Sequence, residues 1–185
     1  KLPGLPGLEV DVRAQIPAFS AVLPFLLLIM VVLRVPIANP SPVFGLALLL
    51  VVLLLGVARW TSLGVLTIVG LVSTTALEYA WDAARFKPEN ALVALPWYLT
   101  FMAIFTVFPF LFRRQLKEQE SPWAAAALAG PAHFTIVYQL VKTTWPNPVM
   151  GLLPAAFALP PLIGLIVLLR GERKLTRKRL AATSG

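Results

Sequence analysis

Six long apolar runs occupy most of this 185-residue chain, and they constrain its fold more than any other feature. The runs cover residues 16–34, 42–58, 63–80, 91–112, 123–141 and 149–169. Most are close to the ~20 residues that an α-helix needs to cross a bilayer. The chain also has 17 prolines, and a proline inside a helix kinks it. We therefore expect an all-α fold, a polytopic transmembrane helix bundle of about six kinked spans.

The composition supports a membrane protein and excludes two alternatives. The chain is 58% hydrophobic and 13% charged, and a water-soluble fold of this length cannot bury so much apolar surface. A closed β-barrel needs short segments of alternating polarity. The run at 46–55 (LALLLVVLLL) has no such alternation, so the spans are predicted to be helices.

The sequence divides into three parts. Residues 1–15, with the pairs Pro3-Gly4 and Pro6-Gly7, are predicted to form an N-terminal linker or loop. Residues 16–169 form the helical bundle, and residues 170–185 form a basic tail or loop. Because the chain begins at Lys1 and ends without a recognisable stop, we expect it to continue in a longer protein whose further helices pack on this bundle. The first run lacks a small-residue cleavage pattern and is not expected to be a signal peptide.

The net charge of +8 is distributed unevenly between the two sides of the predicted membrane. With six spans, 12 of the 16 Lys and Arg fall on one side: Lys1, Arg13, Arg59, Arg113, Arg114, Lys117, Arg170, Arg173, Lys174, Arg177, Lys178 and Arg179. The other four are Arg34, Arg85, Lys87 and Lys142. The positive-inside rule therefore predicts that both ends of this segment are cytoplasmic. We expect the tail to attract anionic lipid head groups, and we expect no nucleic-acid partner.

Polar residues enter the third run on one broad helical face. At about 100° per residue, Gly64, Thr67, Thr74, Thr75, Glu78, Asp82 and Arg85 share this face, which is typical of close helix packing in lipid. Glu78 and Asp82 lie one turn apart and repel each other, so Arg85 or Lys142 is expected to offset them. Two interpretations stay open: a cation or proton entry site or acid/base pair, or a solvated helix end held by an ion pair.

The fifth run contains the one histidine of the chain, His133, close to the predicted bilayer centre. An ionisable group at that depth is a functional candidate by default. The helical wheel places His133 almost opposite Thr135, Tyr138, Gln139 and Lys142, so a single polar stripe is not expected. The alternative is that a neutral His133 hydrogen-bonds a backbone carbonyl freed by a proline, a structural role.

Prolines and aromatic residues mark the remaining runs. Pro160 and Pro161 are predicted to kink or break the sixth run near the depth of His133, as in the substrate sites of many transporters. Four phenylalanines at helical spacing in the fourth run indicate helix packing or lipid contact: Phe101, Phe105, Phe108 and Phe112. The tryptophans and Tyr98 fall near run ends and predict aromatic belts at both interfaces: Trp60, Trp81, Trp97, Trp123 and Trp145.

Several chemical signatures are absent from the sequence. The chain has no cysteine, no His/Asp/Glu cluster with metal-ligand spacing, no glycine-rich phosphate loop and no G-x-S-x-G motif. We therefore expect no metal and no cofactor. An enzyme is the less favoured class.

Five stretches between residues 76 and 165 resemble a bacterial family of large inner-membrane proteins, catalogued as domain of unknown function 2339. They are ALEYAW at 76–81, PWYLTF at 96–101, FPFLFR at 108–113, WAAAALAGPAHF at 123–134 and WPNPVMGLLPAAFALP at 145–160. The resemblance covers about half of the chain and implies architecture and location, but no activity. It implies that Glu78, Trp81, His133, Lys142 and Asn147 lie in recurrent patterns.

The leading functional hypothesis is a transporter-like or envelope-associated protein of a bacterial inner membrane. Its candidate pathway lies between the third, fifth and sixth runs, with Glu78 and Asp82 at the outer mouth and His133 deeper. Two alternatives stay open. A membrane-embedded transferase acting on lipid-linked substrates would use Glu78 and Asp82 as its carboxylates, and a non-catalytic structural subunit would use none of these residues.

Overall fold

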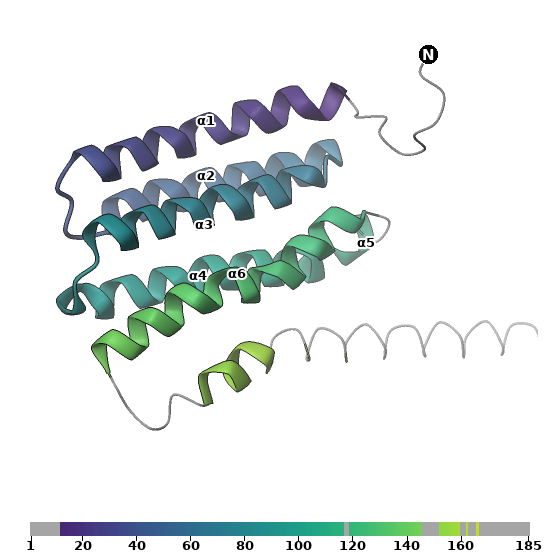
Figure 1. The fold of residues 1–185 in the computed structure, drawn as a ribbon. Coiled ribbons are helices and arrows are strands. Elements are labelled where there is room, and N and C mark those ends of the chain that lie inside the picture. The colour runs from purple at the N-terminus through teal and green to yellow at the C-terminus, as the bar shows by residue number, and fades with distance from the viewer. Residues whose placement is uncertain (1–11, 117–118, 146–151, 160–161, 163–165, 167–185) are drawn as a thin grey trace, which may run out of the picture.

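The computed structural model describes residues 12–116, 119–145, 152–159, 162 and 166, and these residues form helices joined by short turns (Figure 1). The elements in chain order are α1 (Val12–Arg34), α2 (Ser41–Thr61), α3 (Val65–Arg85), the 3-10 turn η1 (Pro88–Asn90), α4 (Ala91–Leu111), α5 (Arg113–Leu116) and α6 (Glu120–Thr144). Four helices, α1, α2, α4 and α6, are long and apolar enough to cross a membrane. The all-helical fold expected from the sequence is thus confirmed for the described residues.

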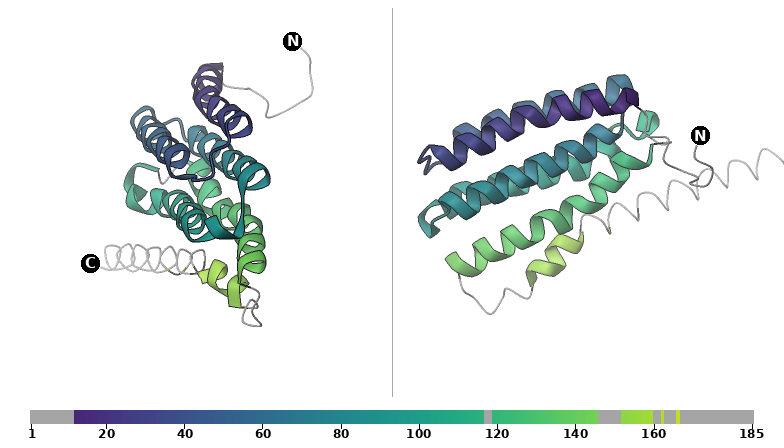
Figure 2. Two further views of the ribbon diagram at one scale, coloured as in Figure 1. Left: turned by 90° about the vertical axis from the view of Figure 1, so that its left-hand side faces the viewer. Right: turned by 45° about the horizontal axis from the view of Figure 1, so that its top comes forward.

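The long helices alternate in direction along the chain and pack side by side (Figure 1). α3 occupies the middle of the bundle, because it contacts α1, α2, α4 and α6. The view along the helices shows α1 on one side, α2 and α3 next, and α4 and α6 beyond them (Figure 2). A further helical stretch, 152–159, lies against α6, where the Phe157 and Phe134 rings are 5.4 Å apart.

An aromatic cluster fills the core between α2, α3 and α4. The ring of Phe44 on α2 lies 5.8 Å from that of Trp81 on α3, 6.0 Å from Tyr98 and 6.1 Å from Phe101 on α4. All four side chains are buried. Trp81 and Tyr98 are therefore core residues, and the prediction that they belong to an interfacial belt is wrong for these two. The Trp81 indole N–H donates to the carbonyl of Ile37, which ties α3 to the turn before α2.

The phenylalanine stripe of α4 packs inward, as its spacing predicts. Phe101, Phe105 and Phe108 are buried, and Phe112 packs against the same core. Phe105 also lies against Gly70 of α3, where a Cβ atom would come within 2.9 Å of Leu54 and 3.3 Å of Phe105. The missing side chain of Gly70 lets α2, α3 and α4 approach closely, the packing mode expected of this face.

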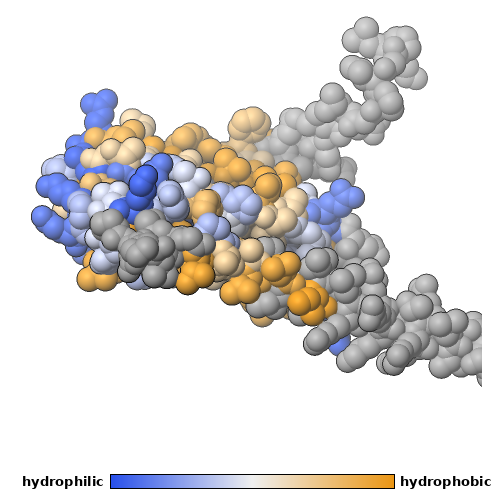
Figure 3. Space-filling view, turned by 60° about the horizontal axis from the view of Figure 1, so that its bottom comes forward, coloured by the Kyte–Doolittle hydropathy of each residue, from blue (hydrophilic) through white to orange (hydrophobic). Residues whose placement is uncertain are grey.

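On the face shown in Figure 3, apolar residues cover much of the length of the bundle, and hydrophilic residues gather mainly at one end. On α1, for example, the exposed apolar side chains include Ile16, Phe19, Leu23, Leu27 and Met30. This surface has the polarity of a protein that contacts lipid chains, because soluble monomers seldom expose large contiguous apolar patches. The antiparallel order brings Arg59 and α5 to one end, which we name the α5 end, and η1 and the end of α6 to the other, which we name the η1 end.

The helix boundaries differ from the predicted runs by four or five residues at two ends, and by up to three elsewhere. α1 begins at Val12, inside the predicted linker, and α3 extends to Arg85, five residues beyond the predicted end of the third run. α3 has the length of a span but is not among the four helices that qualify by hydropathy, since Glu78, Asp82 and Arg85 lie in its last two turns. Most of the predicted sixth run lies outside the described residues, so the count of six spans stays a prediction.

Candidate functional site

A carboxylate and an imidazole meet in the interior of the bundle. His133 Nε2 of α6 lies 3.0 Å from Glu78 Oε2 of α3, and both side chains are 0% exposed. Among the described residues, this is the one contact within 4.0 Å between an acidic and a basic side chain. The two residues nominated from the sequence as separate candidates therefore form a single site, which we name the Glu78–His133 pair. Glu78 lies inside the bundle and not at an open mouth.

Helical register explains why the two side chains face each other. On α6, the buried positions His133, Ile136, Val137 and Leu140 share one face, opposite the exposed Lys142. The wheel prediction that His133 points away from the Thr135–Lys142 stripe is thus confirmed. On α3, Thr74 and Glu78 are buried one turn apart. The Thr74 hydroxyl donates its hydrogen bond to the Gly70 carbonyl and not to the Glu78 carboxyl group.

A second contact holds α3 and α6 together beside the pair. The Tyr79 hydroxyl donates to the carbonyl of Ala132 on α6 at 3.2 Å. This bond involves the residues that directly follow Glu78 and directly precede His133, so it adds a second contact between the two helices at the site.

The histidine also contacts the backbone of its own helix. His133 Nδ1 lies 2.8 Å from the carbonyl oxygen of Ala129. Pro131 frees the carbonyl of Ala127, four residues before it. His133 therefore does bind a backbone carbonyl, as the structural hypothesis expects, but not the one that the proline frees.

The polar atoms of the pair are incompletely satisfied. Glu78 Oε1 has no hydrogen-bond partner among the described residues, and the 3.0 Å approach of Oε2 to His133 Nε2 lacks the alignment of a full hydrogen bond. Buried polar groups are nearly always hydrogen-bonded, and a buried carboxyl oxygen without a partner requires an explanation. The geometry leaves one acceptor position on Glu78 open to a further donor.

The backbone contact fixes the position of one proton on His133. A carbonyl oxygen only accepts, so His133 Nδ1 must carry a hydrogen toward Ala129. Nε2 then faces the carboxyl group either as the donor of an imidazolium or as a bare acceptor. The contact is attractive when one proton lies between the groups, as carboxylate with imidazolium or as carboxylic acid with neutral imidazole. Without that proton, two acceptors face each other and repel.

Asp82 lies one turn beyond Glu78, at the half-buried end of α3. The Tyr98 hydroxyl of α4 donates to Asp82 Oδ1 at 3.3 Å. Asp82 is thus the nearest acidic group to Glu78 along α3, placed between the buried pair and the η1 end. Tyr98 was not among the site residues nominated from the sequence, because its position in an apolar run gave no sign of a polar partner.

Neither of the cations expected to offset the two carboxylates contacts them. Arg85 donates to the carbonyls of Val32 and Leu33, the last turn of α1, where carbonyl groups lack helical partners. Lys142 is exposed and forms no ion pair with a described carboxylate. The prediction that Arg85 or Lys142 pairs with Glu78 and Asp82 is therefore wrong, since His133 faces Glu78 and Tyr98 binds Asp82.

Three sequence candidates lie outside the described residues: Pro160, Pro161 and Asn147. No group of three or more potential metal ligands occurs in the described part of the chain. The Glu78–His133 pair provides two such groups, and their 3.0 Å separation is short enough for one proton to be shared between them.

Comparisons with family models, curated proteins and solved structures found no match to this chain. The fold and the site by themselves define a class: an all-helical protein with four candidate membrane spans among its described residues. An ionisable pair is buried between two of its helices.

Proposed function

We propose that this chain forms part of a proton-coupled, transporter-like protein of a bacterial inner membrane, in which the Glu78–His133 pair holds the coupled proton. The observation that carries the proposal is the 3.0 Å approach of two fully buried ionisable groups from α3 and α6. Ionisable residues inside a membrane bundle are costly, and they mark ion or proton pathways in many pumps and transporters.

The proposed mechanism follows from the acceptor–acceptor repulsion of the deprotonated pair. With its proton, the pair draws α3 and α6 together. When the proton leaves, Glu78 Oε2 and His133 Nε2 repel each other at 3.0 Å, which favours a separated arrangement of the two helices. Asp82, half-buried on the side of the η1 end, would receive the proton on its way to water. A two-state helix contact biased by one proton is the element that coupling requires.

The proposal includes the topology. We infer six spans with both ends of the segment cytoplasmic, which places the α5 end in the cytoplasm and the η1 end in the periplasm. Arg59, Arg113 and Arg114 lie at the α5 end, and Arg34, Arg85, Lys87 and Lys142 lie at the η1 end. These two groups are similar in size, so the orientation depends on the six cations of the 170–185 tail, which follow the sixth run. The resemblance to the domain of unknown function 2339 supports the same location.

The two alternatives gain no specific support. A transferase would need Glu78 and Asp82 accessible to a lipid-linked substrate, but Glu78 is buried against His133. A purely structural subunit would keep α3 and α6 together irrespective of pH. This last difference provides the test.

A single reporter cysteine tests the pH-dependent separation, since the chain contains no cysteine of its own. Thr74→Cys places a thiol on the buried face of α3, one turn from Glu78. We expect a small maleimide to label it faster in alkaline than in acidic buffer. The rates are compared with those of Ala84→Cys, an exposed control at the η1 end of α3, which corrects for thiolate reactivity. In the background Glu78→Met/His133→Leu, this excess should disappear. Equal pH profiles in both backgrounds would refute the proposal in favour of a structural role.

Transport is measured in vesicles loaded with a pH-sensitive dye. For a solute whose gradient drives proton movement through the wild type, Glu78→Gln and His133→Ala should abolish the proton movement while the protein still inserts normally. Lys87→Gln is the matched control, because Lys87 is an exposed cation outside the bundle core. Full coupling in both Glu78→Gln and His133→Ala would exclude the pair as the proton site.

A further inference from the structure

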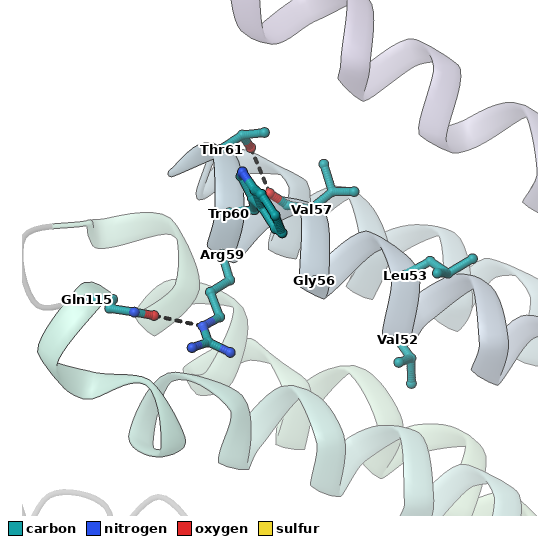
Figure 4. A pocket seen from close by; sticks show the side chains of 8 residues that line it. All are labelled: Val52, Leu53, Gly56, Val57, Arg59, Trp60, Thr61 and Gln115. Atoms are coloured by element: carbon teal, nitrogen blue, oxygen red, sulfur yellow. Dashed lines mark hydrogen bonds between the residues drawn. The ribbon is translucent and has the colours of Figure 1, made fainter.

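A groove opens at the α5 end of the bundle, far from the Glu78–His133 pair. One cavity of about 790 Å³ lies along α2 and is lined by Val52, Val57, Trp60 and Gln115 among others. Figure 4 shows Arg59 in this pocket, with its side chain directed from α2 toward Gln115 of α5. Two neighbouring cavities, of about 550 Å³ and 270 Å³, also have Arg59 in their lining. We name these three together the Arg59 groove.

The groove has a cationic end and an apolar floor. Arg113 and Arg114 of α5 line one of these cavities together with Arg59, so three basic residues border the groove where α2, α4 and α5 meet. Away from them, the lining consists of apolar residues of α2 and α4, including Val52, Leu55 and Phe108. A charged end that continues into an apolar trough matches a molecule with an anionic head and a hydrocarbon chain.

Arg59 is held in place for such a ligand. Its Nε donates to Gln115 Oε1 at 2.8 Å, and its guanidinium carbon lies 4.2 Å from the centre of the Phe112 ring. These contacts leave its two terminal nitrogens free of any carboxylate within 4.0 Å among the described residues. Arginine binds phosphate through two parallel N–H donors, and a fixed guanidinium loses less freedom on binding.

The level of the groove along the bundle also fits a lipid. Trp60, next to Arg59, is 92% exposed, and exposed tryptophans are enriched where a membrane meets water. Gly56 lies one turn below at the floor, and a Cβ atom added there would meet nothing within 4 Å. The backbone of α2 is thus accessible to a chain lying along it.

We propose that the Arg59 groove binds one anionic phospholipid, with its phosphate at Arg59, Arg113 and Arg114 and one acyl chain over Gly56 between α2 and α4. The proposed site uses no residue of the 170–185 tail, and it requires no transport activity. Each cation near an anionic head group is expected to change the affinity about fivefold.

Fluorescence quenching by brominated lipids tests the proposal in the full chain reconstituted in phosphatidylcholine bilayers. Dibrominated phosphatidylglycerol should quench Trp60 at a lower mole fraction than dibrominated phosphatidylcholine, and the difference from Trp60→Phe isolates this tryptophan from the other four. Arg59→Gln should weaken the preference about fivefold, and the triple variant with Arg113→Gln and Arg114→Gln should remove it. Lys87→Gln, at the η1 end, should leave it unchanged.

Gly56→Leu tests the acyl chain separately. The added side chain enters open space, so the variant should fold while its leucine blocks the trough. We expect loss of the preferential quenching. If Gly56→Leu keeps the preference while the arginine variants lose it, the site binds a phosphate head group alone and the groove proposal is wrong. Equal quenching by the two brominated lipids in the wild type would overturn the site altogether.

Discussion

Replacing the members of the Glu78–His133 pair one at a time should destabilise the bundle by unequal amounts. In Glu78→Met, His133 keeps its contact with the Ala129 carbonyl through Nδ1 and leaves one ring nitrogen without a partner. A single unsatisfied buried polar group costs about 1–3 kcal/mol. In His133→Leu, Glu78 loses its one described ionisable partner, and its Oε1 already has no hydrogen-bond partner. A buried ionisable group left without compensation costs about 3–5 kcal/mol, so this variant should be the less stable.

The double variant Glu78→Met/His133→Leu should be far more stable than the sum of the single changes implies. Replacing a buried ion pair by apolar residues of similar volume is often neutral, or stabilising by about 1–4 kcal/mol. The two single losses together amount to about 4–8 kcal/mol. A coupling energy of several kcal/mol is therefore expected from the cycle. Glu78→Gln is the matched control, because an amide can still bond to His133 and should lose less stability than Glu78→Met.

The assay is reversible unfolding in detergent micelles, followed by helical circular dichroism and by tryptophan fluorescence. The free energy of unfolding of the four cycle members gives the coupling energy directly. Additive effects, with the double variant as unstable as the sum of the singles, would refute the pairing of Glu78 with His133. A larger loss in Glu78→Met than in His133→Leu would refute the assignment of the Ala129 contact as the one that satisfies the histidine.

Three further outcomes test the packing and the topology. Gly70→Val should destabilise the bundle by about 1–3 kcal/mol, because its side chain would press on Leu54 and Phe105. Gly45→Val is the control and should have little steric effect, because its side chain meets open space. Thermal unfolding in detergent compares the two variants. Phe44→Ala should cost about 3 kcal/mol by denaturant titration, the low end for such a change, because lipid chains are as apolar as the core. Lys87→Cys should react with an impermeant maleimide in intact cells and Arg114→Cys should not, and the reverse pattern would invert the proposed topology.

The helices were predictable because a membrane span needs a long apolar run. The predicted range 91–112 differs by one residue from α4 (Ala91–Leu111), and the inward packing of its phenylalanines follows from their spacing alone. The third run was predicted less well, since its apolar stretch ends at Ala80. α3 continues to Arg85 because Trp81 packs on Phe44 and Arg85 bonds the end of α1. This extension turns Glu78 from a helix end into an interior residue.

The pairing of Glu78 with His133 was beyond what a helical wheel provides. A wheel gives the direction of a side chain within its own helix, and it correctly separated His133 from the Thr135–Lys142 stripe. It gives no information on which helix lies opposite, because that depends on contacts between segments 55 positions apart. For the same reason, local charge rules assigned Arg85 to the nearest carboxylates, although it bonds carbonyls of α1.

Packing alone does not account for the presence of the Glu78–His133 pair in the interior of the bundle. A bundle that required only stability would gain from apolar residues at positions 78 and 133, because desolvating two ionisable groups is costly even when they pair. The pairing is also incomplete, since Glu78 Oε1 lacks a described partner and the His133 contact is poorly aligned. The pair is also not the sole polar contact between α3 and α6, because the Tyr79 hydroxyl bonds the Ala132 carbonyl of α6. An interaction that is no better than apolar packing and that depends on one proton is what a pH-sensitive contact between α3 and α6 requires.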